Sequence, residues 1–280
     1  MTGKAPIPHM PVGACDCHFH IFGPAARYPF APDRSYTPPD ALLPDFHLFQ
    51  SRMGLTRSVI VQPSVYGFDN SCTLDALDAL GKEARGVVVV NGSFTEADIA
   101  AMNARGARGV RFNLLFSGGP DAAEIERVAD LIRPFGWHIQ LLIDCRTLPQ
   151  LAPSLRRTRL PLVFDHFGHI PAPLALASEG FGMLVELLRE GLAWCKLSGA
   201  YRISEHRDAE NCEPIAVALA EAARSRLVWG SDWPHPGYTN PEPGPVTLLQ
   251  RLFDWLGDEA MQAVLVDNPA QLYNFGASDR

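Results

Sequence analysis

Short apolar runs alternate with helix-like stretches along almost the whole chain, and this alternation limits the possible folds more than any other feature. The apolar runs have the length of buried strands. They cover residues 14–19, 57–62, 86–90, 109–112, 138–143, 162–164, 193–197 and 227–229. Because parallel strands need helical crossovers between them, eight strands that are each followed by a helix predict a parallel α/β fold.

The helix-like stretches lie between the predicted strands, and several carry start signals. They cover residues 44–53, 72–84, 95–104, 121–135, 148–156, 181–189, 213–223, 246–256 and 258–266. Thr95 precedes Asp98 by three residues, and Asp121 precedes Glu124 by the same spacing. Both stretches are therefore expected to begin with a capping box.

The length of 280 residues suits one closed barrel. We predict a single domain over residues 1–280, an α/β protein of the (β/α)8 TIM barrel type. A doubly wound open sheet is the alternative, although no Gly-x-Gly-x-x-Gly motif follows the first strand. Two connections, residues 20–43 and 235–245, are longer than usual. Each follows a strand, so both long loops are expected at the C-terminal face, where barrel active sites lie.

Charge and cysteine usage limit the function classes. The net charge is −7, and no run of Lys or Arg suits a nucleic acid or a membrane surface. No apolar stretch approaches the roughly 18 residues of a membrane helix. Six cysteines are scattered through apolar or helical segments, which favours reduced thiols in a cytoplasmic protein. We expect a small-molecule protein, with a homo-oligomer left open.

Polar side chains gather at the predicted C-terminal ends of the strands, where packing alone does not require them. They include His18, His20, Gln62, Ser64, Arg111, Asn113, Asp144, Asp165, His166, Ser198, Arg202 and Asp232. His18 and His20 are two apart on a strand and point the same way. In a closed barrel the first and last strands are neighbours, so Asp232 faces this pair. The pattern predicts a polar reaction centre; buried structural histidines and a capping Asp232 are the alternative.

Eight segments together carry a resemblance to a known family. They are residues 16–23, 36–39, 62–70, 109–113, 165–168, 196–199, 229–235 and 268–273. The chain resembles the amidohydrolase superfamily of (β/α)8 barrels, which is marked by His-x-His after strand one, a His after a middle strand and an Asp after strand eight. It is most similar to the branch that contains 2-pyrone-4,6-dicarboxylate lactonase, 4-sulfomuconolactone hydrolase and galactarolactone isomerase.

The resemblance implies roles for individual residues. Asp232 would be the general base that activates water, and His18, His20 and His166 would surround the scissile carbonyl group. The substrate-binding candidates are Tyr36, Ser64, Tyr66, Arg111, Asn113 and Arg202.

Two departures from the dicarboxylate lactonase pattern bear on the substrate. After Asn113 the chain continues with Leu114, Leu115 and Phe116, without the second arginine that clamps a carboxylate there. Asp144 stands where that lactonase has a binding tyrosine, and we expect its charge to repel a second substrate carboxylate. An anionic lactone with one acidic group, or with a hydroxylated ring, is therefore expected.

The need for a metal stays open at this stage. The bridging lysine of binuclear relatives is missing after strand four, which argues against two ions. His18, His20, His166 and Asp232 could hold a single divalent metal, most plausibly zinc, or the same groups could act without one. No nucleotide or redox cofactor is expected.

The predicted activity is hydrolysis of a lactone ring ester by water that Asp232 activates. The alternatives are a lactone isomerase acting on a sugar diacid lactone and a metal-dependent decarboxylase. A non-enzymatic protein that binds such metabolites is the remaining alternative.

Overall fold

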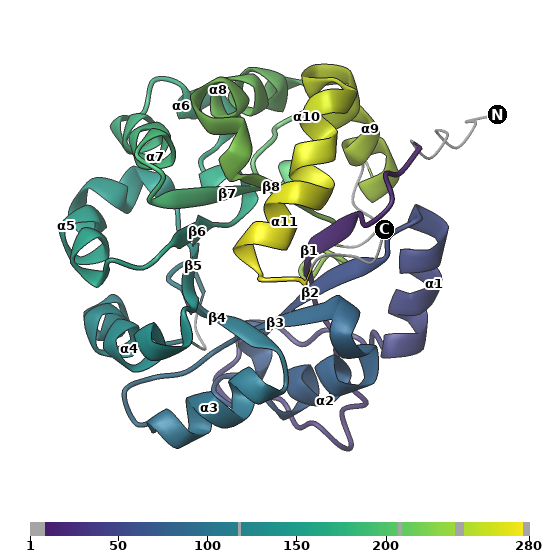
Figure 1. Ribbon diagram of the computed structural model, residues 1–280, viewed down its shortest axis with the longest axis vertical. Coiled ribbons are helices and arrows are strands. Elements are labelled where there is room, and N and C mark those ends of the chain that lie inside the picture. The colour runs from purple at the N-terminus through teal and green to yellow at the C-terminus, as the bar shows by residue number, and fades with distance from the viewer. Residues whose placement is uncertain (1–8, 117–118, 207–208, 239–243, 277–280) are drawn as a thin grey trace.

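The computed structural model describes residues 9–116, 119–206, 209–238 and 244–276. Eight parallel strands follow one another around a barrel in chain order, with helices outside them (Figure 1). The strands are β1 (Cys15–Phe19), β2 (Arg57–Val61), β3 (Ala84–Val88), β4 (Ala107–Asn113), β5 (His138–Leu142), β6 (Leu162–Phe164), β7 (Ala193–Ser198) and β8 (Leu227–Gly230). The predicted (β/α)8 barrel is confirmed, and the open sheet is excluded.

The barrel closes where the chain segments that continue β1 and β8 meet. The Asp232 amide donates to the His18 carbonyl at 2.8 Å, and the His20 amide donates to the Trp233 carbonyl at 2.8 Å. Gly230 permits this approach, because a Cβ atom at that position would lie 2.5 Å from the Cβ of His18. This junction, here called the seam between β1 and β8, therefore brings the His18–His20 pair and Asp232 to one place.

The described helices comprise the nine predicted stretches, with shifts at their ends, and two short helices, residues 172–175 and 268–272, that were not predicted. They are α1 (Leu43–Met53), α2 (Ser71–Leu80), α3 (Glu96–Ala104), α4 (Ile125–Ile132), α5 (Leu148–Thr158), α6 (Ala172–Ala175), α7 (Glu179–Arg189), α8 (Glu213–Ala223), α9 (Pro245–Leu256), α10 (Asp258–Gln262) and α11 (Asn268–Leu272). The predicted helix 72–84 ends at Leu80, because Gly81 adopts a φ of 70° that breaks it. One 3₁₀ turn then leads into β3, which begins two residues before the predicted start.

Of the two predicted capping boxes, one forms. The Thr95 hydroxyl accepts from the Asp98 amide, and the Asp98 carboxylate accepts from the Thr95 amide. The box predicted at Asp121 is wrong. The Glu124 carboxylate instead accepts from the amide of Gly92 at 2.6 Å, and residues 122–124 form a 3₁₀ turn before α4. The acid that the spacing assigns to the helix cap, Glu124, therefore binds the backbone of a different loop.

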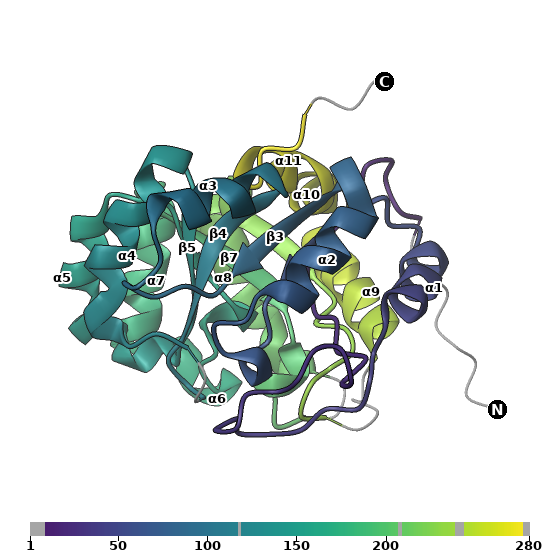
Figure 2. The same ribbon diagram turned by 90° about the horizontal axis from the view of Figure 1, so that it is seen from below.

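The two ends of the barrel differ. Tyr273 and Phe275, which follow α11, pack against Cys15 and Cys17 of β1 and plug the N-terminal end. The long loop between β1 and α1 lies on the opposite side from α11 (Figure 2). The C-terminal strand ends are therefore the open end of the barrel. Of the loop predicted over residues 235–245, positions 239–243 lie outside the described residues.

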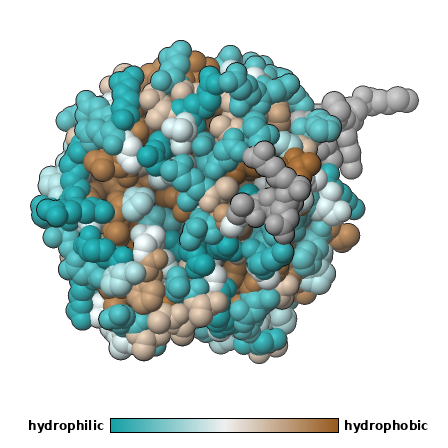
Figure 3. All heavy atoms as spheres, in the orientation of Figure 1, coloured by the Kyte–Doolittle hydropathy of each residue, from teal (hydrophilic) through white to brown (hydrophobic). Residues whose placement is uncertain are grey.

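The outer surface seen from the α11 side is mixed. Hydrophilic residues there surround small hydrophobic patches (Figure 3). In the described part of the chain, every helix is too short or too polar to cross a membrane.

A glycine in α7 gives a stability test of the packing. A Cβ atom on Gly180 would lie 1.8 Å from the Cys145 carbonyl oxygen, whereas one on Gly182 in the same helix would meet nothing within 4 Å. Gly180→Ala should lower the free energy of unfolding by about 3 kcal/mol, because backbone must move. Gly182→Ala, the matched control, should raise it by up to about 1 kcal/mol. Urea denaturation measures both, and equal effects would contradict this packing.

Candidate active site

A cavity of about 330 Å³ opens at the C-terminal ends of the strands. Its lining comprises His20, Ser35, Tyr36, Ser64, Arg111, Asn113, Phe116, Leu142, His166, His169, Arg202, Asp232, Pro236, Gly237 and Tyr238. Of the substrate-binding candidates predicted from the sequence, Tyr36, Ser64, Arg111, Asn113 and Arg202 are in this lining. The lining combines cations, hydroxyl groups and an amide with apolar and aromatic side chains. Such a surface can bind a small molecule with one polar, anionic end.

The histidine pair and Asp232 meet at the floor of the cavity. The Nε2 atoms of His18 and His20 are 3.3 Å apart. Asp232 Oδ1 lies 3.9 Å from Nε2 of His18 and 3.8 Å from Nε2 of His20. This oxygen is buried and has no hydrogen-bond partner among the described residues. A buried carboxylate oxygen without a donor is costly unless a ligand or water supplies one.

The other oxygen of Asp232 is firmly held. Arg202 Nε and the Tyr201 hydroxyl each donate to Oδ2 at 2.5 Å. Burial alone would raise the pKa of Asp232, but the guanidinium of Arg202 holds this pKa well below its ordinary value. Asp232 is therefore ionised at neutral pH, with one oxygen anchored and the other facing the histidines.

His166 completes the cluster from the turn after β6. Its Nδ1 is 2.9 Å from the Ser198 hydroxyl of β7. Its backbone φ is 51°, and that of Asp232 is 61°, both in the left-handed region. His169 and His235, which flank the site, also have positive φ values. Such strain in residues other than glycine is uncommon and gathers at functional sites.

The imidazoles are neutral at neutral pH. Burial is the main cause that lowers the pKa values of His18, His20 and His166 from the ordinary range. The nearby carboxylate of Asp232 opposes this shift without reversing it. Each ring therefore carries one N–H and one lone pair, so each can both donate and accept a hydrogen bond.

Asp16 ties the seam together behind the site. Its carboxylate accepts from the amides of His18 at 3.0 Å and Ser231 at 2.9 Å, and from the Ser231 hydroxyl at 2.5 Å. Burial raises the pKa of Asp16 to about 6, although these hydrogen bonds oppose the rise. Asp16 thus orients the residues before Asp232 and the strand that carries His18.

The charges around the histidines do not fit an added divalent cation. In spacing, His18, His166 and Asp232 could reach one ion, since one ligand atom from each lies within 4.8 Å of the others. However, three buried carboxylates, those of Asp16, Asp165 and Asp232, are already matched in charge by three cations, Arg111, Lys196 and Arg202. A divalent ion would add two uncompensated positive charges to the interior.

Two residues need correction. Tyr66 is not in the cavity lining: its hydroxyl accepts from the Gly23 amide at 2.8 Å, and its ring stacks on Phe30. Its place is therefore structural rather than substrate-binding. Asp144 also lies outside the lining, and its carboxylate pairs with Arg146 at 2.5 Å. Leu142 is the β5 residue that reaches the cavity, so the expected repulsion by Asp144 does not apply.

Other site residues carried no clear signal in the sequence. Tyr201 holds Asp232, and its ring and that of Tyr238 lie on the Arg202 guanidinium at 5.3 and 5.0 Å. His169 also lines the cavity, four residues after Asp165. Tyr201 could have been suspected as the neighbour of Arg202, whereas no periodicity marks Tyr238 in its loop.

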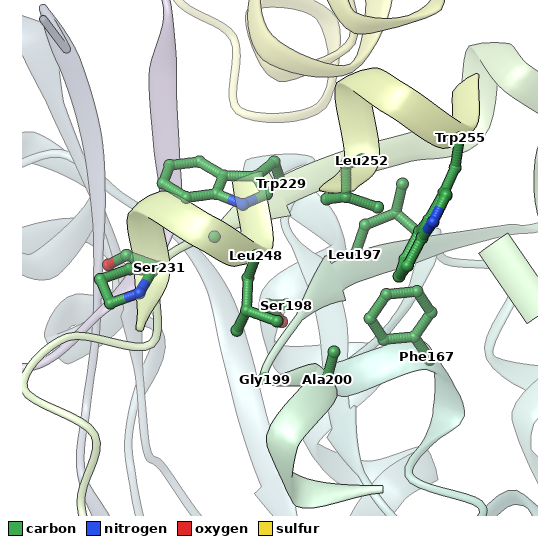
Figure 4. A pocket seen from close by; sticks show the side chains of 12 residues that line it. Phe167, Leu197, Ser198, Gly199, Ala200, Trp229, Ser231, Leu248, Leu252 and Trp255 are labelled. Atoms are coloured by element: carbon green, nitrogen blue, oxygen red, sulfur yellow. The ribbon is translucent and has the colours of Figure 1, made fainter. Parts of the chain in front are cut away.

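A second cavity lies beside the barrel rather than at its mouth. It is enclosed by Trp229, Leu248, Leu252 and Trp255, with Leu197 close by (Figure 4). Its volume is about 10 Å³, which is at the lower limit for one water molecule. It offers no room for a substrate. The mouth cavity, where the histidines, arginines and Asp232 gather, is therefore the candidate active site.

Comparison with known proteins identifies the family of the chain. Residues 15–275 match a family model described as Amidohydrolase. A 4-sulfomuconolactone hydrolase of Rhizobium radiobacter is 37% identical over 96% of this chain and 93% of its own. A 2-pyrone-4,6-dicarboxylate hydrolase of Comamonas testosteroni is 32% identical over 94% of this chain and 91% of its own.

Two further proteins extend the comparison. A D-galactarolactone isomerase of Agrobacterium fabrum is 29% identical over 98% of this chain and 95% of its own. A crystal structure from Agrobacterium tumefaciens superposes with a TM-score of 0.88 at 28% identity, covering 97% of this chain and 99% of that one.

Proposed function

This chain belongs to the amidohydrolase family, and from that premise we propose that it hydrolyses the ring ester of an anionic lactone. The observation that carries the proposal is Oδ1 of Asp232 at the floor of the cavity, for which the described part of the chain supplies no hydrogen-bond donor. An ionised carboxylate in this position can accept a proton from water that stands beside a bound ester.

Asp232 acts as the general base. Its Oδ1 accepts a proton as the water oxygen forms a bond to the lactone carbonyl carbon. Arg202 and Tyr201 keep the carboxylate ionised and fix its direction through Oδ2. Asp232 alone is thus the proton acceptor, because the neighbouring imidazoles are already engaged by other groups or face the carbonyl.

The tetrahedral intermediate places a negative charge on the former carbonyl oxygen. Arg111 and His166 line the cavity and supply donors for this oxygen. Arg111 is held in place by the Gln62 carbonyl at 3.2 Å and by Asp165 at 3.7 Å. When the intermediate collapses, the ring C–O bond breaks and the proton on Asp232 passes to the leaving alkoxide. The product is an open-chain hydroxy acid.

The anionic group of the lactone is bound at the polar side of the cavity. Arg202 uses Nε for Asp232 and Nη2 for the Pro236 carbonyl, which leaves Nη1 without a described partner. Ser64 and Tyr36 add hydroxyl donors at the same cavity. The guanidinium can therefore hold the base and a substrate carboxylate at once, which couples binding to correct placement.

Phe116 and Leu142 limit the cavity to one anionic end. Phe116 is 47% exposed, and with Leu142 it gives the cavity an apolar side. A second carboxylate would meet an aromatic ring there instead of a cation. We therefore assign a lactone with one acidic group and an uncharged remainder.

Phe116→Arg should extend the substrate range to lactones with a second carboxylate. A cation at the cavity edge should lower KM for a lactone with a second carboxylate about fivefold, since a partly exposed ion pair contributes about 1 kcal/mol. KM for a monoanionic lactone should stay the same or rise. Steady-state kinetics on matched mono- and dicarboxylate lactones measure this, and an unchanged ratio would remove Phe116 from the specificity argument.

Turnover in oxygen-18 water tests the proposed reaction itself. Carboxymethyl butenolides, pyrone carboxylates and sugar diacid lactones would be incubated with the enzyme, with and without chelator. Hydrolysis places one solvent oxygen in an open-chain product, as mass spectrometry would show. An isomeric lactone without label would instead establish acyl migration, and release of carbon dioxide would establish a decarboxylase. Binding without turnover of any of these lactones would overturn the proposal.

A further inference from the structure

Lys196 is a buried cation directly behind the histidine pair, and the proposed reaction does not use it. It lies on β7 with none of its surface exposed. Its Nζ donates to Gln140 Oε1 at 2.7 Å and lies 3.2 Å from His18 Nδ1. Asp165 Oδ1 is 3.4 Å away and supplies the countercharge.

The hydrogen bonds from Lys196 can run in one direction only. An ammonium group has donors and no acceptor, so His18 Nδ1 must accept from Lys196. Asp165 Oδ1 also lies 3.2 Å from this nitrogen and could accept from it, but a proton on Nδ1 would then face the ammonium of Lys196 at 3.2 Å, donor against donor. Lys196 itself, at 3.4 Å, can donate to Asp165 Oδ1. His18 therefore carries its proton on Nε2.

The tautomer of the second ring, His20, follows from its contact with a backbone carbonyl. The Val61 carbonyl oxygen has no proton to give, and it lies 2.7 Å from His20 Nδ1. His20 must therefore donate from Nδ1 and keep its lone pair on Nε2. That lone pair is 3.3 Å from His18 Nε2, where the proton of His18 points. Lys196, His18, His20 and Val61 thus form one chain of donors in series.

We propose that Lys196 is a positioning residue that fixes the tautomers of His18 and His20 and stands as the positive charge behind them. With this chain in place, the pair offers no two free lone pairs to a metal ion, because the lone pair of His20 is used and His18 presents an N–H. The inference concerns the protein without substrate and does not depend on which lactone it hydrolyses.

The tautomers can be read in the unmodified protein. Long-range proton–nitrogen spectra of metal-free protein labelled at histidine nitrogens report which nitrogen of each ring is protonated. His18→Gln and His20→Gln variants assign the signals. We expect His18 protonated at Nε2 and His20 protonated at Nδ1. A wild-type His18 protonated at Nδ1 would overturn the proposal, whatever the variants do.

Lys196→Met tests the cation itself, with the exposed Lys82→Met as the matched control. Removing the buried charge should strengthen zinc binding in equilibrium dialysis by about tenfold or more, because a positive charge no longer opposes the ion. The His18 tautomer should then mix, and kcat in metal-free protein should fall with little change in KM. Wild-type zinc affinity together with a wild-type tautomer in a folded Lys196→Met protein would refute the role.

These outcomes separate this inference from the proposed function. Loss of lactone turnover in every assay would leave the tautomer and zinc measurements unaffected. Conversely, a wild-type enzyme that hydrolyses lactones while His18 is protonated at Nδ1 would keep the function and discard Lys196 as its positioning residue. If Lys196→Met fails to fold, the spectra of the wild-type protein alone decide.

Discussion

Asp232→Asn is expected to lower kcat by about 10³-fold or more while the protein stays folded. The amide that replaces the carboxylate cannot take a proton from water at neutral pH. Its oxygen can still accept from Arg202 and Tyr201, so the side chain should keep its position. KM should change little, because the carboxylate is not assigned to binding.

Asparagine is the appropriate replacement because of the backbone at this position. Asp232 has a φ of 61°, a conformation that asparagine adopts more readily than most residues. The melting temperature should therefore stay close to that of the wild type. Asp254→Asn, in an exposed carboxylate of α9, is the matched control and should leave kcat unchanged. A folded Asp232→Asn enzyme with near wild-type kcat would remove Asp232 as the base.

Replacing Arg202 should have the second largest effect, and it should change the pH profile as well as the rate. Arg202→Met removes the donor that holds Asp232 Oδ2 and the group assigned to the substrate anion, so kcat/KM should fall about 10²- to 10³-fold. The loss of its positive charge should also raise the pKa of Asp232, since Arg202 is the strongest of the groups that lower it.

The direction of the pH effect follows from the role of the base. Asp232 must be ionised to accept a proton, so activity is lost as pH falls through its pKa. A raised pKa in Arg202→Met moves this acid limb of kcat/KM to higher pH. Arg202→Lys should move it less, because a charge is retained, and the exposed Arg189→Met should not move it. An acid limb unchanged in Arg202→Met would show that Arg202 does not tune the base.

The part of this site that could be predicted is the part that strand geometry controls. The two-residue period of β1 places His18 and His20 on one side, and closure of a parallel barrel places β8 beside β1. Those two facts suffice to bring Asp232 to within 4 Å of both rings. The cavity residues Arg111 and Ser64 follow from the same rule, since they end or follow their strands.

The residues that could not be predicted depend on loop conformation and on competition between partners. Tyr66 belongs to a family motif, yet its 3₁₀ turn directs it into the apolar cluster around Phe30. Tyr238 reaches Arg202 through a loop path that has no periodicity. Glu124 binds the amide of Gly92 and not the start of its own helix, and this contact joins residues that are far apart in the sequence.

Lys196 shows a related limit of sequence patterns. Its position on an apolar strand indicates that Lys196 is buried, but not which groups surround it. Which ring nitrogen it contacts depends on side chains from β1, β5 and β6 that the sequence does not place relative to one another. Function carried by hydrogen-bond direction is therefore visible only once the side chains are in position.

The seam between β1 and β8 has a consequence for how the enzyme gains activity. The proposed base and the histidines beside it come from opposite ends of the chain, and they meet only through the pairing of His18 with Asp232 and of His20 with Trp233. No partial chain that lacks either end contains the reacting groups. Turnover is therefore a direct readout of completed folding, and a nascent chain would stay inert until its last strand docks against its first.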